Sequence, residues 1–362
     1  MALPQPVIKR IKSFEDTAVK VPGFFKSLFM RDPESDSKSD KIEIHIRRNH
    51  RQIMPGLPNF NEGTPGASRR KWTKKTFETP IVGLHDSFDK NDLLQTGFDE
   101  TQYDASDGKF MARLLKLMIR GWDNLYTMHQ YTTEYMAAQV MQTGALNMLD
   151  ENGATVFELD FEMRASHILN VATAWSDPAA DIIGDLQGAS DTLKKDGFAT
   201  AKFALMGMNA YISFLSNTAV KERYLDDRMK LGELNPSIQP DGTRYMGTVD
   251  INNNKLSILT YTDYFEEFGG SDPIEFMDPD KVIIMPGKEA MDLRWVYGGI
   301  PIIGASAPPF SQMMPRSLNP DGVVIKPRIY HDQKVDNIIT EIMSRPLPVP
   351  VGIDQFMILI TT

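Results

Sequence analysis

The sequence contains no cysteine, which excludes disulfide bonds, thiolate catalysis and cysteine-ligated zinc. It has no run of about 18 consecutive apolar residues, the length that a membrane-spanning helix requires. Its first twenty residues, MALPQPVIKRIKSFEDTAVK, lack the apolar core of about 7–15 residues that a signal peptide has. These absences predict a protein that is made and used in a reducing cytoplasm and has no contact with a membrane.

Signatures of catalytic or ligand-binding sites are also scarce. The segment Gly304-Ala-Ser-Ala-Pro308 lacks the final glycine of a nucleophile elbow. Asp250-Ile-Asn-Asn-Asn254 resembles the start of a calcium loop, but Lys255 stands where such a loop needs glycine and Tyr261 where it needs glutamate. A tight turn between two strands is the better interpretation of that segment.

Six histidines are present, and no two of them have the i, i+4 spacing of a helical zinc site. His45 and His50 are five residues apart, so on a strand they would face opposite sides. His129 falls on a predicted helix, where it is more often a packing residue than a ligand. We therefore expect no enzymatic activity, no cofactor, and no catalytic or metal site.

The composition is that of a globular protein large enough for one large or two medium cores. Of the 362 residues, 41% are hydrophobic, 24% are charged and 9% are aromatic. The net charge of −9 is unevenly spread. Residues 41–75 hold nine lysines and arginines and two glutamates, whereas residues 76–107 hold eight acids and one lysine. The basic block allows three interpretations, which are nucleic-acid binding, contact with an acidic partner, and a solvated face.

The first 40 residues show one apolar cluster within charged and small residues. The cluster spans residues 22–32 and includes Phe24, Phe25, Leu28, Phe29 and Met30. Leaving such side chains in water forgoes roughly 1.5–3 kcal/mol each. The pattern predicts an arm that is anchored at one hydrophobic point.

Residues 41–77 predict an extended β-hairpin. Ile42, Ile44 and Ile46 alternate with polar residues, and a second alternating run covers residues 70–77. Between the two runs lies a stretch rich in glycine and proline, residues 54–66. The hairpin has little apolar content, so we expect it to reach outward and rest on another surface.

A long helix is predicted from Lys109 to about Leu146, with Gly144 and Asn147 marking its end. Apolar or neutral residues recur there at three-and-four spacing: Met111, Leu115, Met118, Trp122, Leu125, Thr132, Met136 and Val140. About 38 residues at ~1.5 Å each make a rod of nearly 57 Å. Strict heptads are absent, which favours a structural spine over a coiled coil.

The rest of the chain has a mixed α and β pattern. Strands are expected at 155–162, at 202–206, on both sides of 252–254, at 281–286, at 322–330 and at 356–361; helices are expected near 178–195 and from 209 to 230. The proline-rich segment 345–350 is expected to separate the last two strands.

This order of elements resembles the lambda-type major capsid protein family of tailed phages, whose members have the Hong Kong 97-like fold. The motifs that carry the likeness are Phe24–Asp32, Phe77-Glu-Thr-Pro-Ile81 with Leu93, Leu94 and Gly97, Thr155–Glu162, Trp175-Ser-Asp-Pro-Ala-Ala-Asp-Ile182, Asp280–Pro286 and Phe356–Thr361. Each motif is weak alone, and their order along nearly the whole chain is the specific signal.

The resemblance implies an α+β chain with an N-terminal arm at 1–38 and an extended loop at 39–90. It implies a peripheral domain that contains the spine helix, at 91–170 and 318–362, and a mixed α/β axial domain at 171–317. It also implies self-assembly as hexamers and pentamers into an icosahedral head shell around double-stranded DNA. The shell would form in the host cytoplasm and become part of the virion.

Other partners implied are scaffolding and portal proteins, with a decoration protein left open; packaged DNA would be enclosed without specific binding. The residues expected to contact neighbouring copies are Phe24, Phe25, Phe29, Arg47, Arg48, Arg51, Arg69, Arg70, Lys71, Trp72 and Phe77. The basic hairpin would meet the acidic stretch 76–107 of an adjacent copy. Two alternatives remain, an encapsulin-like compartment shell and an α+β enzyme with an unrecognised site.

Overall fold

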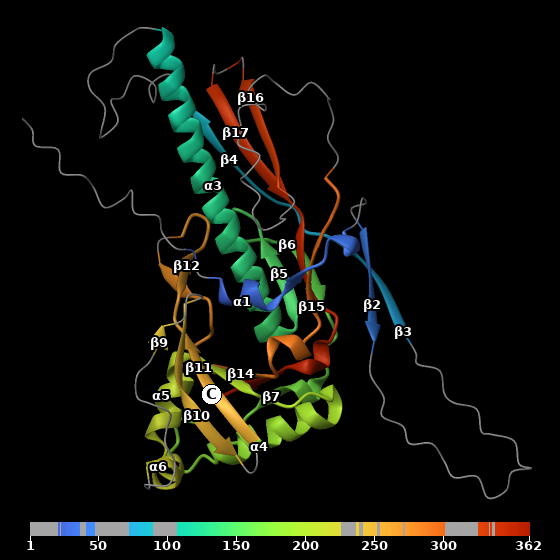
Figure 1. Cartoon of the computed structure of the whole chain (residues 1–362), viewed down its shortest axis with the longest axis vertical. Coiled ribbons are helices and arrows are strands. Elements are labelled where there is room, and N and C mark those ends of the chain that lie inside the picture. Colours follow the sequence, from blue (N-terminus) through green and yellow to red (C-terminus); the bar gives the residue numbers. More distant parts are fainter. Residues whose placement is uncertain are drawn as a thin grey trace, which may run out of the picture. The chain divides into compact units, whose positions relative to one another are not determined.

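The computed structural model describes residues 21, 23–36, 41–47, 72–89, 107–225, 237–238, 242–251, 254–270, 272–300, 325–332, 334 and 337–362. The chain forms two compact units (Figure 1). The first comprises residues 1–21, 81–131 and 300–344, and the second comprises residues 22–80, 132–299 and 345–362. The long helix α3 (Asp107–Thr143) begins in the first unit and ends in the second. None of the helices in the described part is long and apolar enough to cross a membrane.

In the first unit, α3 packs on an antiparallel sheet of three strands. The strands are β4 (Val82–Phe88), β17 (Asn337–Ser344) in the centre and β16 (Lys326–Asp332). Trp122 and Leu125 of α3 form a small core with Ile342 of β17. At Gly121 the helix lies so close to β4 that a Cβ atom would come within 2.5 Å of the Phe88 ring. A larger residue at this position would require the side chains of Phe88 and Asp86 to move.

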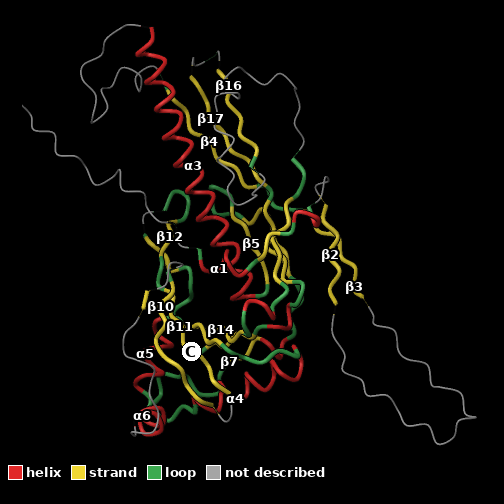
Figure 2. Tube along the Cα trace, in the orientation of Figure 1, coloured by secondary structure: helices red, strands yellow, loops and turns green. Residues whose placement is uncertain are grey.

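The main core lies in the second unit, on a mixed sheet of seven strands (Figure 2). In spatial order the strands are β7 (Ile168–Asn170), β19 (Met357–Ile360), β14 (Lys281–Met285), β8 (Phe203–Met206), β11 (Asn254–Tyr261), β10 (Thr243–Ile251) and β9 (Ser237–Ile238). The helices of this unit are α4 (Ile182–Thr192), continued by a π turn at Leu193–Gly197, α5 (Met208–Ser216) and α6 (Thr218–Leu225). Buried side chains from α4, α5, α6 and the central strands form one continuous hydrophobic cluster.

A second sheet of this unit has three strands, β1 (Met30–Arg31), β15 (Leu293–Tyr297) and β18 (Pro346–Pro350), with β15 in the centre. Three two-stranded hairpins complete the sheets: β2 (Lys41–Arg47) with β3 (Trp72–Glu78), β5 (Ala145–Leu149) with β6 (Thr155–Asp160), and β12 (Tyr264–Glu266) with β13 (Pro273–Glu275). Short helical segments are α1 (Phe24–Leu28) and the 3-10 turns Pro33–Ser35, Ala165–His167, Lys288–Ala290 and Ile353–Gln355.

Most predicted elements are confirmed. The long helix is α3, and Gly144, in the left-handed region at φ 70°, follows its last residue. The hairpin over 41–77 corresponds to the antiparallel pair β2–β3. The two strands expected on either side of 252–254 are β10 and β11, which pair antiparallel with Ile251 opposite Asn254.

Two predictions of secondary structure are wrong. The helix expected from 209 to 230 is interrupted at Asn217, whose side chain accepts a hydrogen bond from the N–H of Val220 and starts α6 as a new helix. The proline-rich segment 345–350 contains a strand, β18, and a further strand, β17, precedes it. β18 lies at a sheet edge, where a missing N–H can face away from the partner.

The predicted boundaries between arm, extended loop, peripheral domain and axial domain, at residues 38, 90, 170 and 317, stay a prediction.

Candidate assembly surfaces

The N-terminal apolar cluster is buried within the chain's own second unit. Phe24, Phe25 and Phe29 are 6%, 0% and 4% exposed. Phe24 and Phe25 lie 5.7 and 5.4 Å, ring centroid to ring centroid, from Tyr261 of β11. The arm is thus anchored on its own subunit, and a contact of these rings with a neighbouring copy stays a prediction.

A buried carboxylate holds α1 in place. Glu134 of α3 is fully buried, and its carboxylate accepts hydrogen bonds from the N–H groups of Phe25 and Lys26, both at 2.8 Å. The Tyr261 hydroxyl donates a third at 2.9 Å. Burial raises the pKa of Glu134, against the lowering effect of these donors. The carboxylate thereby satisfies N–H groups in the first turn of α1 that have no partner within that helix.

Two aspartates fasten the rest of the arm to β15. Asp32 accepts a hydrogen bond from Arg294 at 2.8 Å, and Asp36 accepts one from the N–H of Tyr297 at 3.0 Å. Arg31 binds Asp36 through both guanidinium nitrogens and lies over the Tyr297 ring at 4.6 Å from its centroid. The charged residues of the arm therefore hold the segment before the hairpin against β15.

The β2–β3 hairpin is clamped at its base. Ile42 is 5% exposed, and the ring of Phe77 lies 6.5 Å from that of Phe161. Just after β3, the backbone oxygen of Thr79 accepts a hydrogen bond of 2.9 Å from Arg345. Gly298 lets Thr79 approach this closely, because a Cβ atom at position 298 would lie 2.2 Å from the Thr79 hydroxyl oxygen. The clamp holds the near end of the hairpin in a defined position.

Beyond its base, the hairpin is a two-stranded ribbon. Lys41 pairs with Glu78 in register, and the pairing runs to Arg47 opposite Trp72. Within the described residues, β2 and β3 pair with no other strand. A two-stranded ribbon of this kind is marginally stable by itself in water.

Several predicted contact residues cannot be placed on this surface. Arg48, Arg51, Arg69, Arg70 and Lys71 lie outside the residues that the structure describes. For Arg47 and Trp72 only the backbone is described, as the last pair of the ribbon. Their contact with neighbouring copies stays a prediction.

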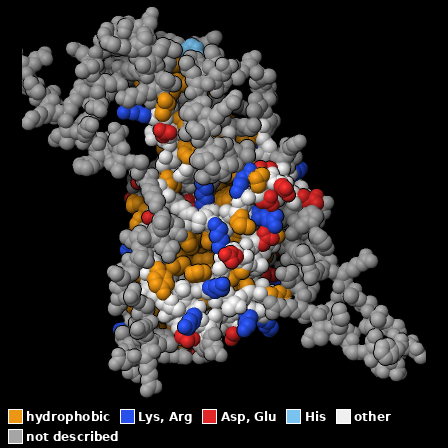
Figure 3. Space-filling view, viewed as in Figure 1, with side chains coloured by type: hydrophobic (Ala, Val, Ile, Leu, Met, Phe, Trp, Pro, Cys, Tyr) orange, Lys and Arg blue, Asp and Glu red, His pale blue; other side chains and the backbone are white. Residues whose placement is uncertain are grey.

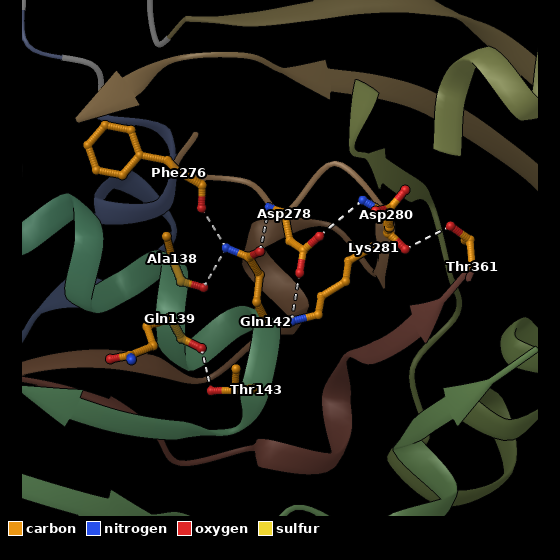
Figure 4. A network of polar contacts seen from close by, with 9 residues as sticks. All are labelled: Ala138, Gln139, Gln142, Thr143, Phe276, Asp278, Asp280, Lys281 and Thr361. Carbon is orange, nitrogen blue, oxygen red and sulfur yellow. Dashed lines mark hydrogen bonds and ion pairs between the residues drawn. The ribbon is translucent and has the colours of Figure 1, made fainter. Parts of the chain in front are cut away.

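A polar junction at the end of α3 has no counterpart in the sequence prediction (Figure 4). The Gln142 amide donates to the backbone oxygens of Ala138, at 3.1 Å, and Phe276, at 2.7 Å. Its oxygen accepts from the N–H of Asp278 at 2.8 Å. Asp278 forms an ion pair with Lys281 of β14 at 3.2 Å. This junction fixes the end of the spine to the central sheet.

The C-terminal strand joins the same junction. Thr361 donates its hydroxyl to the backbone oxygen of Asp280 at 2.7 Å, and its N–H to the same oxygen at 2.9 Å (Figure 4). Asp280 also donates its N–H to the Asp278 side chain at 3.1 Å. No sequence signal singles out Gln142, because α3 also buries the polar residues His129, Thr133 and Glu134.

The buried histidines take part in packing. His129 of α3 lies 2.6 Å from the Ser344 hydroxyl, and His167 lies 2.9 Å from the backbone oxygen of Phe356. Among the described residues, no group of three or more histidine, cysteine, aspartate or glutamate side chains could hold a metal ion.

The chain is similar to phage capsid proteins. The sequence profile of the family described as phage major capsid protein E matches residues 11–361. A solved structure assigned as the capsid protein of a prophage in E. coli CFT073 is 16% identical, with 95% of this chain and 94% of that chain covered and a TM-score of 0.59.

The capsid of cyanophage P-SCSP1u is 10% identical, with 99% and 92% covered and a TM-score of 0.47; the capsid of Ralstonia phage GP4 is 15% identical, with 100% and 93% covered and a TM-score of 0.44. No curated protein sequence matches the chain.

Proposed function

Because the chain belongs to the phage major capsid protein E family, it is a structural subunit of the phage head shell, and we propose that its copies are joined through the β2–β3 hairpin. The chain has the Hong Kong 97-like fold and assembles with copies of itself into the shell of the virion. Membership of this family favours the capsid function over the two alternatives, a cellular compartment shell and an enzyme.

The observation that carries the proposal is the hairpin itself, which is clamped at its base and pairs with no third strand within the described residues. Its base is held by Ile42, Phe77 and the Arg345 clamp, whereas its strands form a ribbon without a third strand in the described part of the chain. A ribbon that is stable only marginally gains order when it lies on another surface. A neighbouring copy supplies such a surface in a shell.

Charged and apolar side chains have different roles at this contact. The hairpin and its loop, residues 41–75, carry seven more positive than negative residues. Trp72 supplies an apolar anchor, and the positive charges supply register and speed of encounter with an acidic surface. Heterologous contacts of this kind close into a shell when the rotations between copies close.

We further propose that the copies group as hexamers and pentamers, and that scaffolding, portal and decoration proteins bind the assembled lattice. A net charge of −9 keeps the shell wall from adhering to packaged DNA, since phosphates and acidic side chains repel one another.

The test is assembly of the purified full-length chain, followed by negative-stain electron microscopy. The wild type is expected to form uniform closed particles. Replacing Arg69, Arg70 and Lys71 with glutamate changes the loop charge by six units, so particle yield should fall by about tenfold or more.

The matched control reverses three exposed lysines of the second unit, Lys194, Lys195 and Lys221. Both triple variants should keep the circular dichroism spectrum of the wild type. Particles formed equally well by the Arg69, Arg70 and Lys71 variant would contradict the role of the hairpin. A wild type that stays monomeric would contradict the proposed assembly itself.

A further inference from the structure

The β12–β13 hairpin exposes an unusual set of large apolar side chains. Tyr264 and Phe268 are 52% and 68% exposed. Ile274, 42% exposed, lies opposite Phe265 and therefore on the other face of the ribbon from Tyr264. Within the described residues, β12 and β13 pair with each other and with no third strand (Figure 1). Tyr264 lies directly opposite Glu275, so an exposed ring and a carboxylate share one face of the ribbon. Exposed apolar side chains bordered by charges mark sites of protein contact. On the face of the molecule that Figure 3 shows, hydrophobic side chains gather among scattered charged ones.

The base of this hairpin is rigidly held. The Phe265 ring lies 5.0 Å from the ring of Tyr135 and 4.9 Å from that of Phe276, centroid to centroid. The N–H of Phe276 donates to the backbone oxygen of Asp263 at 3.0 Å. A partner therefore meets apolar side chains that are already positioned, which lowers the entropy lost on binding.

The hairpin is also strongly acidic. Residues 264–275 contain four carboxylates, Glu266, Glu267, Asp272 and Glu275, and no lysine or arginine. Their field reaches neighbouring side chains, since Glu275 raises the pKa of Tyr264. Burial, assisted by Glu267, raises the pKa of Tyr135. A partner must therefore be both apolar and positively charged.

These two requirements exclude several occupants and favour one. Nucleic acid and anionic lipid surfaces would be repelled by the four carboxylates. The segment 41–75 of this same chain combines nine basic residues with apolar ones, among them Trp72. We propose that the β12–β13 hairpin of one copy is the docking site for segment 41–75 of a second copy.

This inference rests on the proposed function and names the surface that receives the loop. The acidic stretch 76–107, the receptor expected from the sequence, lies largely outside the described residues. The β12–β13 hairpin, which is described in full apart from residue 271, places carboxylates beside the exposed rings of Tyr264 and Phe268. Charge then gives the loop its register, and burial of Tyr264 and Phe268 gives the contact its affinity.

Thiol crosslinking tests the contact directly, because the chain has no cysteine of its own. Ser68→Cys is placed in one full-length chain and Asp272→Cys in a second chain with a different tag. The two are co-assembled into particles and treated with a short bis-maleimide. The expected product is a mixed dimer that carries both tags.

Two matched positions replace Asp272 in control chains. Asp191→Cys substitutes an exposed aspartate of α4, and Ser87→Cys substitutes an exposed residue of β4 within the acidic stretch 76–107. If Ser87→Cys gives mixed dimers and Asp272→Cys gives none, the proposal would be overturned in favour of the stretch 76–107. Equal mixed dimers from Asp191→Cys would overturn it as unspecific.

A chain carrying both Ser68→Cys and Asp272→Cys tests for a contact within one subunit. If this chain is crosslinked within itself, while the two singly substituted chains give no mixed dimers, docking between copies would be overturned. An Asp272 thiol that crosslinks only to an added accessory protein would assign the surface to that protein instead.

Charge exchange provides an independent measurement. Glu266→Lys with Glu267→Lys should slow assembly by about tenfold, because like charges then face each other. Adding Arg69→Glu, Arg70→Glu and Lys71→Glu to the same chain should restore most of the rate. If the wild type assembles and the exchange restores nothing, the docking site is wrong. If the wild type never assembles, the proposed function fails first.

Discussion

At the scale of single residues, the arm depends on one buried acid. Glu134 lies on the long helix α3, and the residues that bind it, Phe25, Lys26 and Tyr261, are more than 100 positions away in the sequence. A carboxylate has enough lone pairs to accept all three hydrogen bonds. An alanine at this position would remove the acceptor of two buried donors and of the partly buried N–H of Lys26.

Replacing Glu134 with alanine should therefore lower the free energy of unfolding by about 3–5 kcal/mol. Glu134→Gln keeps the shape and one acceptor oxygen, so its loss should be smaller. Urea unfolding of the unassembled chain measures both, provided that the slope with urea stays constant. Glu158→Ala, at an exposed position of β6, is the control and should change stability by less than about 0.5 kcal/mol. A loss at Glu134→Ala no larger than this control would show that the arm is held by its phenylalanines alone.

At the scale of elements, β18 shows how a strand forms from a proline-rich sequence. Pro346, Pro348 and Pro350 alternate with Leu347 and Val349, and all five are buried. Alternate residues of a strand direct their N–H groups to the same side. The hydrogen-bonded pairs with β15 must therefore be those of Leu347 and Val349, opposite Val296 and Arg294. The prolines, which have no N–H, occupy the positions that need none.

A proline at one of the hydrogen-bonded positions should disrupt β18. Val349→Pro removes an N–H that bonds to β15, so it should cost about 3 kcal/mol or more of unfolding free energy. Val349→Ala is the control for lost side-chain volume and should cost less. Thermal unfolding followed by circular dichroism compares the two variants. Equal destabilisation by both would mean that packing alone, and not the backbone pairing, holds β18.

At the scale of the whole molecule, the separation of charge along the chain matters more than its total. A net charge of −9 conceals a block of +7 at 41–75 and one of −7 at 76–107. Opposite charges on different copies attract one another over roughly one Debye length, about 10 Å at 0.1 M salt and about 3 Å at 1 M. Assembly that uses such charges is therefore sensitive to salt.

Raising the salt concentration from about 0.1 M to about 0.5 M should slow the assembly of the wild type by about tenfold. The measurement is light scattering against time on the purified chain. The Arg69, Arg70 and Lys71 to glutamate variant has lost the attraction, so its residual rate should vary little with salt. Assembly that becomes faster with salt would point to contacts that are mainly apolar, since such contacts do not weaken as charges are screened.

Elements whose signals are local could be predicted from the amino-acid order without knowledge of the fold. The three-and-four spacing of α3, its end at Gly144 and the alternation of β2 and β3 each arise from residues close together in the chain. The order of these elements was enough to indicate the capsid family. The basic character of segment 41–75 is likewise a property of composition, and no fold is needed to read it.

Tertiary structure alone decided which of these elements touch. The three donors to Glu134, the junction at Gln142 and the clamp of Thr79 by Arg345 each join residues more than 100 positions apart. β18 became a strand because β15 lies beside it and leaves its prolines on the unpaired side. Hydrogen bonds and burial of this kind depend on distances in space, which local composition does not contain. The spine helix and the basic hairpin can therefore be predicted from the sequence, whereas the contacts that hold the arm, the strands and the acidic hairpin depend on the fold.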